Sequence, residues 1–189
     1  KHYINGLHYI EGISKNVIDN IVNEVWTDAK DMSIEDGVYD MYPKARQYAL
    51  DLTEKELMQA VEGMYHNLNT LQSRSGNQLP FTSINYGTCT LPEGRMVTKA
   101  LLEGSIKGVG KIKKTAIFPC GIFQCMKGVN RKPEDPNYDL FRLALKSTAQ
   151  RLYPNYVNVD WSVNVGYDVN DPKTYVSTMG CRTYNGFDI

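Results

Sequence analysis

A single cysteine near the carboxyl end stands in the sequence context most suggestive of chemistry. Cys181 follows Met179 and Gly180 and precedes Arg182, directly after a short apolar stretch. Glycine beside a cysteine allows the backbone a tight path and a close approach to a ligand. A thiol on such a loop is presented to a cavity, where it can react. The alternative is that Cys181 is a buried small hydrophobic residue, which is common for unpaired cysteines.

The other cysteines and the histidines form no recognisable reactive set. Four cysteines in 189 residues are too few and too scattered for a disulfide scaffold, and no pair has Cys-x-x-Cys spacing. Cys120 and Cys125 have no neighbouring His or Cys that could complete a zinc site, so we expect no bound metal. The three histidines lie in the first third of the chain, with no acid or nucleophile at a recognisable offset. A hydrolytic triad is therefore not expected.

Composition indicates an ordinary globular chain and excludes several kinds of partner. Of the residues 42% are hydrophobic and 22% charged, and 21 basic side chains balance 21 acidic ones. A protein that grips nucleic-acid phosphates usually has a basic excess, which this sequence does not have. No apolar run reaches the length of a membrane span, and nothing resembles a signal peptide. We expect a soluble, cytoplasmic protein that binds neither nucleic acid nor membrane.

Helical periodicity dominates the first part of the chain. Apolar residues at helical spacing predict a helix over about 14–30, and the acidic stretch 31–43, broken by a glycine and a proline, predicts a loop. A second helix is predicted to begin at the capping box Thr53-Glu54-Lys55-Glu56 and to follow an apolar stripe to a stop near Gly76.

Strand and helix patterns then alternate to the end of the chain. The expected elements are a strand at 80–86, a helix from Pro92 to Gly108, a strand at 115–126, a helix at 140–152 and a strand at 156–163. This order favours right-handed crossovers and a parallel sheet, as in a barrel or an open doubly wound sheet. Functional loops of such folds gather at the carboxyl ends of the strands, where Cys181 would lie.

Short motifs in a fixed order run through roughly residues 55–184. They are Asn69-Thr70-Leu71, Ser73-Arg74-Ser75-Gly76, Pro80-Phe81-Thr82-Ser83-Ile84-Asn85-Tyr86-Gly87-Thr88, Pro92-Glu93-Gly94-Arg95-Met96-Val97, Ile117-Phe118-Pro119, Gly128-Val129-Asn130, Asp135-Pro136-Asn137-Tyr138-Asp139-Leu140-Phe141, Arg151-Leu152-Tyr153-Pro154 and Met179-Gly180-Cys181-Arg182. In this order they resemble the anaerobic, class III ribonucleoside-triphosphate reductases, which are glycyl-radical enzymes.

The resemblance implies an α/β fold, a ten-stranded α/β barrel of the ribonucleotide reductase and glycyl-radical type. This chain would supply about one half of it, preceded by helices. Residues 1–189 would then be one incomplete domain, with 1–78 a mainly helical lead-in and 79–189 the β/α units of a half barrel that ends in a cysteine finger loop. Because the chain begins at Lys1 and half a barrel exposes strand edges, we expect the remainder of the same polypeptide as a partner.

The same resemblance assigns the chemistry to Cys181. Members carry one cysteine at the tip of the finger loop, and Cys181 in Met-Gly-Cys-Arg matches it. A glycyl radical outside this chain, generated by an iron–sulfur, S-adenosylmethionine-dependent activase, oxidises that thiol to a thiyl radical. The thiyl takes hydrogen from the 3′ carbon of the ribose, water leaves the 2′ carbon, and a reductant completes the deoxyribonucleotide. Cysteine suits this exchange because its S–H bond is weak enough to pass a hydrogen atom in both directions.

Further residues and partners follow from the resemblance. Met179, Gly180 and Arg182 would belong to the substrate loop, where Arg182 would touch a phosphate or brace the loop. Ribonucleoside triphosphates would be substrates, and dNTPs or ATP would bind as effectors at a homodimer interface. Phe81 aligns with an aromatic residue that packs on the effector base in some members; alternatively, Phe81 is the first core residue of its strand.

Three functional hypotheses stay open on the sequence. The first is a part of an anaerobic reductase that supplies the thiyl cysteine but is inactive alone, since the glycyl-radical segment, the zinc-binding cysteines and a second active-site cysteine have no counterpart here. The second is a catalytically inert effector-binding or dimerisation fragment. The third is another glycyl-radical enzyme, such as a pyruvate formate-lyase relative, which the motifs at 83–88 and 135–139 disfavour.

Overall fold

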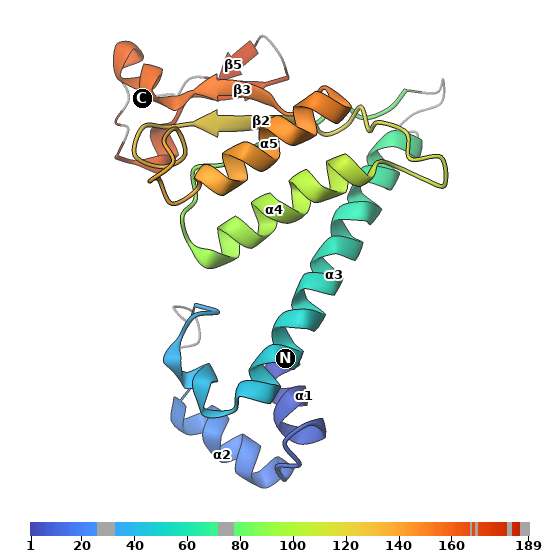
Figure 1. The fold of residues 1–189 in the computed structure, drawn as a ribbon, viewed down its shortest axis with the longest axis vertical. Coiled ribbons are helices and arrows are strands. Elements are labelled where there is room, and N and C mark those ends of the chain that lie inside the picture. Colours follow the sequence, from blue (N-terminus) through green and yellow to red (C-terminus); the bar gives the residue numbers. More distant parts are fainter. Residues whose placement is uncertain (26–32, 72–77, 167, 169, 181–182, 186–189) are drawn as a thin grey trace. The chain divides into compact units, whose positions relative to one another are not determined.

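The computed structural model describes residues 1–25, 33–71, 78–166, 168, 170–180 and 183–185 (Figure 1). The chain forms two compact units, Lys1–Gln59 and Ala60–Ile189. Among the described residues, no helix is both long enough and apolar enough to cross a membrane.

The first unit is helical. It contains α1 (His2–Tyr9), α2 (Lys15–Val25), the short 3₁₀ helix η2 (Gly37–Met41) and the first part of α3 (Pro43–Thr70). Tyr3, Leu7, Ile18 and Ala45 form its buried core. A Cβ on Gly6 would lie 2.9 Å from the Cα of Ala45, so glycine is what allows α1 to approach α3 so closely.

The second predicted helix differs from α3 at both ends, because α3 runs from Pro43 to Thr70 and not from Thr53 to a stop near Gly76. The end of the first predicted helix stays a prediction. Helix α2 is described to Val25, and the remainder of the expected helix lies outside the described residues. The prediction that a helix begins at Thr53 is wrong, because α3 already begins at Pro43 and Thr53 lies in its interior. The Thr53 hydroxyl donates to the carbonyl of Ala49 at 2.7 Å and caps nothing. Proline is well suited to a helix start, since its missing N–H would have no partner there.

A three-stranded parallel sheet is the centre of the second unit. Its strands are β1 (Ser83–Tyr86), β2 (Cys120–Cys125) and β3 (Asn155–Asn158), in the order β1-β2-β3. Helices α4 (Pro92–Lys107) and α5 (Tyr138–Arg151) make the two crossovers, which confirms the predicted alternation and parallel pairing. The fold is therefore mixed α/β, with a small parallel sheet and helices.

All three strands are shorter than the apolar patterns suggested. Strand β2 begins only at Cys120, directly after Pro119, which has no N–H to donate to a neighbouring strand. The expected strand at 156–163 ends at Asn158 and continues as the 3₁₀ helix η3 (Val159–Val165). Within η3 the Asp160 carboxylate accepts the Lys127 backbone N–H at 3.1 and 3.2 Å, and this contact favours the turn over continued strand.

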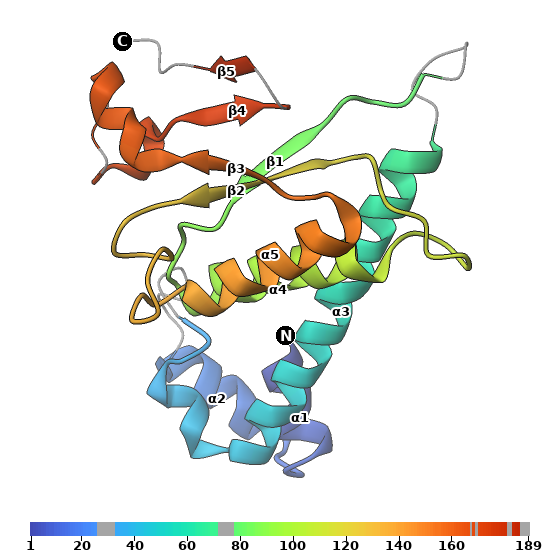
Figure 2. The same ribbon diagram turned by 45° about the horizontal axis from the view of Figure 1, so that its top comes forward.

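Figure 2 shows α4 and α5 beneath one face of the sheet. That face is packed with Leu102 of α4, Phe123 of β2, and Leu140 and Ala144 of α5, with Tyr86 of β1 against them. Phe123 and Leu102 are completely buried. Burying a side chain of this size stabilises the fold by about 1.5–3 kcal/mol, so the aromatic and aliphatic cluster holds the sheet to its helices.

A hairpin lies over the opposite face of the sheet, above it in Figure 2. Its strands β4 (Ser177–Met179) and β5 (Thr183–Asn185) pair antiparallel, after the short 3₁₀ helix η4 (Pro172–Thr174). The sheet thus has helices on one side and the hairpin on the other.

Candidate functional site

The β4–β5 hairpin carries the residues that the sequence singled out. Met179 of β4 pairs with Thr183 of β5, and the residues between them along the chain are Gly180, Cys181 and Arg182. Cys181 and Arg182 lie outside the described residues. Met179 is half exposed, whereas Gly180 is buried.

Gly180 has two features that other residues would not tolerate. Its φ is +67°, in the left-handed region that favours glycine. A Cβ built on Gly180 would lie 2.6 Å from Cζ of Phe81, closer than such atoms approach. The glycine directly before Cys181 therefore lets the backbone run against an aromatic ring.

Phe81 lies just before β1 and is 62% exposed. Its ring meets that of Phe118 edge to face, with centroids 5.4 Å apart. Asn69 fixes the position of Phe118, because its Oδ1 accepts the N–H groups of Ile117 at 2.7 Å and Phe118 at 3.1 Å, and its Nδ2 donates to the Phe118 carbonyl. The structure brings Phe81 to the hairpin through Gly180, a proximity that sequence spacing did not suggest.

The side chain of Asn85, in β1, binds the backbone of Thr178 in β4. Asn85 Nδ2 donates to the Thr178 carbonyl at 3.0 Å, and the Thr178 N–H donates to Asn85 Oδ1 at 3.2 Å. One carboxamide thus satisfies both backbone groups of a single strand residue, as a neighbouring strand would. Both distances lie within or at the edge of the normal range for such bonds.

Two further side chains hold Val176, just before β4. The Val176 N–H donates to the hydroxyl of Ser162 at 3.0 Å, and Gln124 Nε2 donates to the Val176 carbonyl at 3.4 Å. Val176, Ser162 and Gln124 are all buried. Buried backbone groups need hydrogen-bond partners, and these side chains supply them where no strand does.

Strand alternation explains why these amides reach the hairpin. Successive side chains of a strand point to opposite faces of the sheet. Tyr86 and Phe123 pack against the helices, so their neighbours Asn85 and Gln124 point to the other face, where the hairpin lies. We call Asn85, Gln124 and Ser162 the hairpin anchors.

Two buried asparagines brace the loops after β1 and β2. Asn130 donates to the carbonyls of Gly87 at 3.1 Å and Gln124 at 2.8 Å, and Asn137 donates to those of Gly87 at 3.1 Å and Cys89 at 2.8 Å. Both asparagines are fully buried. Asn130 and Asn137 belong to motifs that carry the family resemblance, but their roles as loop braces were not predicted.

The described cysteines lie in the parallel sheet and its loops. Cys120 is buried at the start of β2, Cys125 is half-buried at its end, and Cys89 is exposed after β1. Burial raises the pKa of the Cys125 thiol, although nearby Arg131 opposes the shift. Within the described part of the chain, no three His, Cys, Asp or Glu side chains are grouped so that they could hold a metal ion.

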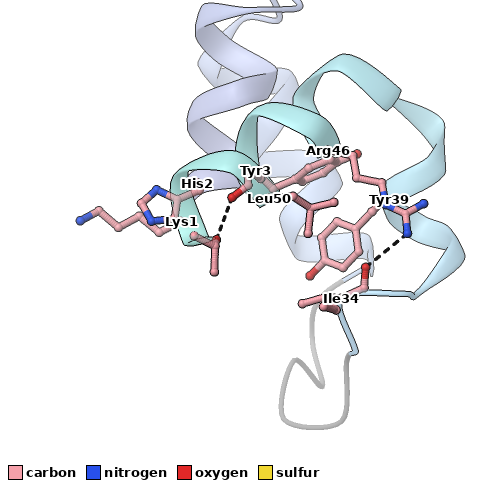
Figure 3. A pocket seen from close by; sticks show the side chains of 9 residues that line it. Lys1, His2, Tyr3, Ile34, Tyr39, Arg46 and Leu50 are labelled. Atoms are coloured by element: carbon pink, nitrogen blue, oxygen red, sulfur yellow. Dashed lines mark hydrogen bonds between the residues drawn. The ribbon is translucent and has the colours of Figure 1, made fainter. Parts of the chain in front are cut away.

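The first unit contains a cavity of its own, of about 170 Å³ (Figure 3). Tyr39 and Leu50 line it, together with Arg46 and His2. Arg46 is already engaged by Asp40 and by the Ile34 carbonyl, and His2 Nε2 lies 2.9 Å from Glu56. Arg46 and His2 are thus both engaged by other groups of the first unit.

The family model for anaerobic ribonucleoside-triphosphate reductase matches residues 12–186 of the chain. Among curated proteins, the chain is 34% identical to the anaerobic ribonucleoside-triphosphate reductase of Salmonella typhimurium over 179 residues, which is 95% of the chain and 24% of that enzyme. The Escherichia coli enzyme of the same name gives the same identity and coverage. The enterobacteria phage T4 enzyme is 37% identical over 151 residues, 80% of the chain and 24% of its own length.

Proposed function

Because the chain belongs to the anaerobic ribonucleoside-triphosphate reductase family, we propose that it is a part of an enzyme that reduces ribonucleoside triphosphates to deoxyribonucleoside triphosphates. The chain spans 24% of the length of the curated relatives, so the remainder of the polypeptide is its first partner. The observation that carries the proposal is the anchored strand β4, which ends two residues before Cys181 in a chain of this family.

In this proposal Cys181 is the catalytic residue. A thiyl radical at its sulfur would take the hydrogen atom from the ribose 3′ carbon and return one later. Water would leave the 2′ carbon, and an external two-electron reductant, formate or a thioredoxin-type dithiol protein, would supply the two electrons and the protons that complete the deoxyribonucleotide. The glycyl radical of the carboxyl-terminal segment, generated by an activase, supplies the oxidising equivalent. Hydrogen-atom transfer needs a neutral thiol at a fixed short distance from the sugar, and a strand held by several side chains supports such positioning.

A half barrel accounts for the two different faces of the sheet. In a barrel of β/α units the helices form the outer layer, and the inner face is enclosed. Helices α4 and α5 cover one face, and the hairpin with Met179 and Gly180 lies over the other, where a finger loop would enter the barrel. We propose that residues 79–189 form this half barrel, with 1–78 as its helical lead-in, and that Met179, Gly180 and Arg182 belong to the substrate loop.

The decisive experiment replaces Cys181 by serine in the full-length reductase. Cys181→Ser should abolish deoxynucleotide formation under anaerobic conditions, because a serine O–H bond is too strong for the exchange. The glycyl radical, followed by electron paramagnetic resonance, should still form with the activase. Cys89→Ser and Cys125→Ser serve as matched controls and should stay close to wild type. Turnover by Cys181→Ser would refute the assignment, and total loss in a control would point to a different sulfur.

One observation favours a second role, in effector binding. The ring of Phe81 is exposed beside the hairpin, and an exposed aromatic ring can stack on a nucleotide base. We propose Phe81 as a contact for a dNTP or ATP effector at a homodimer interface. Thermal shifts of the protein with dATP, dGTP, dTTP and ATP should be specific for some of them and lost in Phe81→Ala. No shift with any of the four nucleotides would exclude this role.

A further inference from the structure

Thr178 is the point at which the hairpin is held to the sheet. In a strand, the N–H and the C=O of one residue point to the same side. Both groups of Thr178 bind the Asn85 carboxamide, so this side of Thr178 faces Asn85 and not the partner strand β5. Val176, two residues earlier, presents its N–H and C=O to Ser162 and Gln124. The open edge of β4 is thus closed by side chains.

Asn85 differs from the other two anchors in its distance from the reactive position. Gln124 and Ser162 hold Val176, whereas Asn85 holds Thr178, which is separated from Cys181 only by Met179 and Gly180. Asn85 is also the only anchor among the described residues that binds both backbone groups of its target. It therefore fixes both the register and the height of β4 over the sheet.

We propose that Asn85 is a positioning residue for Cys181, an inference that rests on the proposed function. Its carboxamide fixes the backbone of Thr178 in β4, the strand from which the chain continues through Gly180 to Cys181. Asparagine is required because Thr178 needs a donor and an acceptor at once. An aspartate would keep the acceptor for the Thr178 N–H but would turn a second negative oxygen toward the Thr178 carbonyl, so the donor would be lost and repulsion gained.

The test uses Asn85→Ala and Asn85→Asp in the full-length, activated reductase. Both should lower kcat on the order of tenfold to a hundredfold, because a small displacement of a reacting group has effects of this size. The KM for the ribonucleoside triphosphate and the glycyl-radical yield should stay near wild type. Hydrogen–deuterium exchange should speed up over residues 176–179.

Ser147→Ala is the matched control on the helix side of the same unit. Ser147 is fully buried and donates to the Tyr153 carbonyl at 2.8 Å, so its loss also removes a side-chain-to-backbone bond. This variant should keep its kcat and its exchange over 176–179. A kcat loss equal to that of Asn85→Ala, or a parallel fall in radical yield in the Asn85 variants, would show a merely structural role and overturn the proposal.

The catalytic role of Cys181 and the positioning role of Asn85 can be refuted separately. If Cys181→Ser is inactive while Asn85→Ala turns over at the wild-type rate, Cys181 stays the catalytic residue and only the positioning role is refuted. If Cys181→Ser retains turnover, the catalytic assignment falls and the positioning role falls with it.

Discussion

Both faces of the parallel sheet are buried at its central strand β2, and the hairpin side is held in addition by hydrogen bonds from side chains of the strands. On the helix side Phe123, Leu102 and Ala144 are fully or almost fully removed from water, and apolar contact binds the layers. On the hairpin side Asn85 and Gln124 bind the backbone of the segment around β4 through hydrogen bonds.

Apolar burial is strong and tolerant of small shifts, because it is proportional to area and has no direction. A hydrogen bond adds only about 0.5–1.5 kcal/mol but demands a particular geometry. We infer that packing on the helix side mainly stabilises the fold, whereas hydrogen bonds on the hairpin side mainly fix the position of β4. Substitutions on the helix side should change stability, and substitutions on the hairpin side should change turnover.

The largest effect on stability is expected at Phe123. Phe123→Ala should lower the free energy of unfolding by about 3–5 kcal/mol, since it empties the centre of the packed face. Urea unfolding measures this loss, and Phe123→Leu should recover much of it. If the folded fraction of Phe123→Ala showed a kcat loss as large as that of Asn85→Ala, the division of roles between the faces would be wrong.

Gly180→Ala should have the next largest effect, on the hairpin side. A non-glycine residue at φ +67° costs about 1–2 kcal/mol, and the new Cβ would also press against Phe81. We expect a lowered Tm by calorimetry together with a strong loss of turnover. Removing the ring in the double variant with Phe81→Ala should restore part of the stability, because only the backbone strain would then remain. Equal losses in the single and double variants would argue against the contact.

Tyr65 on α3 offers a pH-dependent probe of the helix layer. Its hydroxyl donates to the Leu101 carbonyl at 3.1 Å, and burial raises its pKa to about 12, against a smaller opposing effect of Ser105. As the pH rises, Tyr65 ionises in the unfolded chain before it ionises in the folded one. The stabilisation by neutral, buried Tyr65 is therefore complete below pH 10, the ordinary tyrosine pKa, and is lost as the pH rises through about 12.

Tyr65→Phe should therefore cost about 1 kcal/mol at neutral pH and flatten the alkaline loss. Urea midpoints measured between pH 8 and 12 check this, with the exposed Tyr9→Phe as control. An unchanged alkaline slope in Tyr65→Phe would show that other groups cause the loss.

The smallest effect is expected for the ion pair between Lys107 and Glu62. Both side chains are largely exposed, and exposed pairs contribute about 0–1 kcal/mol. Lys107→Met should shift the urea midpoint slightly and leave turnover unchanged, and the shift should shrink in high salt. A large loss would mean that packing between α3 and α4 depends on this pair.

Much of the helix side could be predicted from the sequence. The apolar stripes of α4 and α5, Pro92 at a helix start and Gly108 at a helix end gave the β/α alternation, because burial leaves a periodic pattern. The start of α3 at Pro43 was missed, since the capping-box pattern at Thr53 is compatible with a helix interior.

The hydrogen bonds on the hairpin side could not be predicted from the pattern of apolar and polar residues. Asn85 and Gln124 occupy polar positions of their strands, and polar residues on alternate positions usually indicate contact with solvent. Their partners lie far along the chain, at Thr178 and Val176. These partners are backbone groups, which every residue carries, so no residue type in the sequence marks them. The family motifs identified Asn85, Asn130 and Asn137 as present but gave no reason for them. The reason is the backbone groups that these side chains meet in the folded chain.

The side-chain hydrogen bonds that hold β4 and the residue before it have a consequence for how the position of this strand can evolve. A backbone ladder permits displacement only by whole residues, since a single-step slip would turn every side chain to the wrong face. A carboxamide or a hydroxyl permits adjustments of a fraction of that step, made by one codon change in β1, β2 or η3. The end of β4 could thus be displaced slightly in the course of evolution while the parallel sheet and its helices keep their packing.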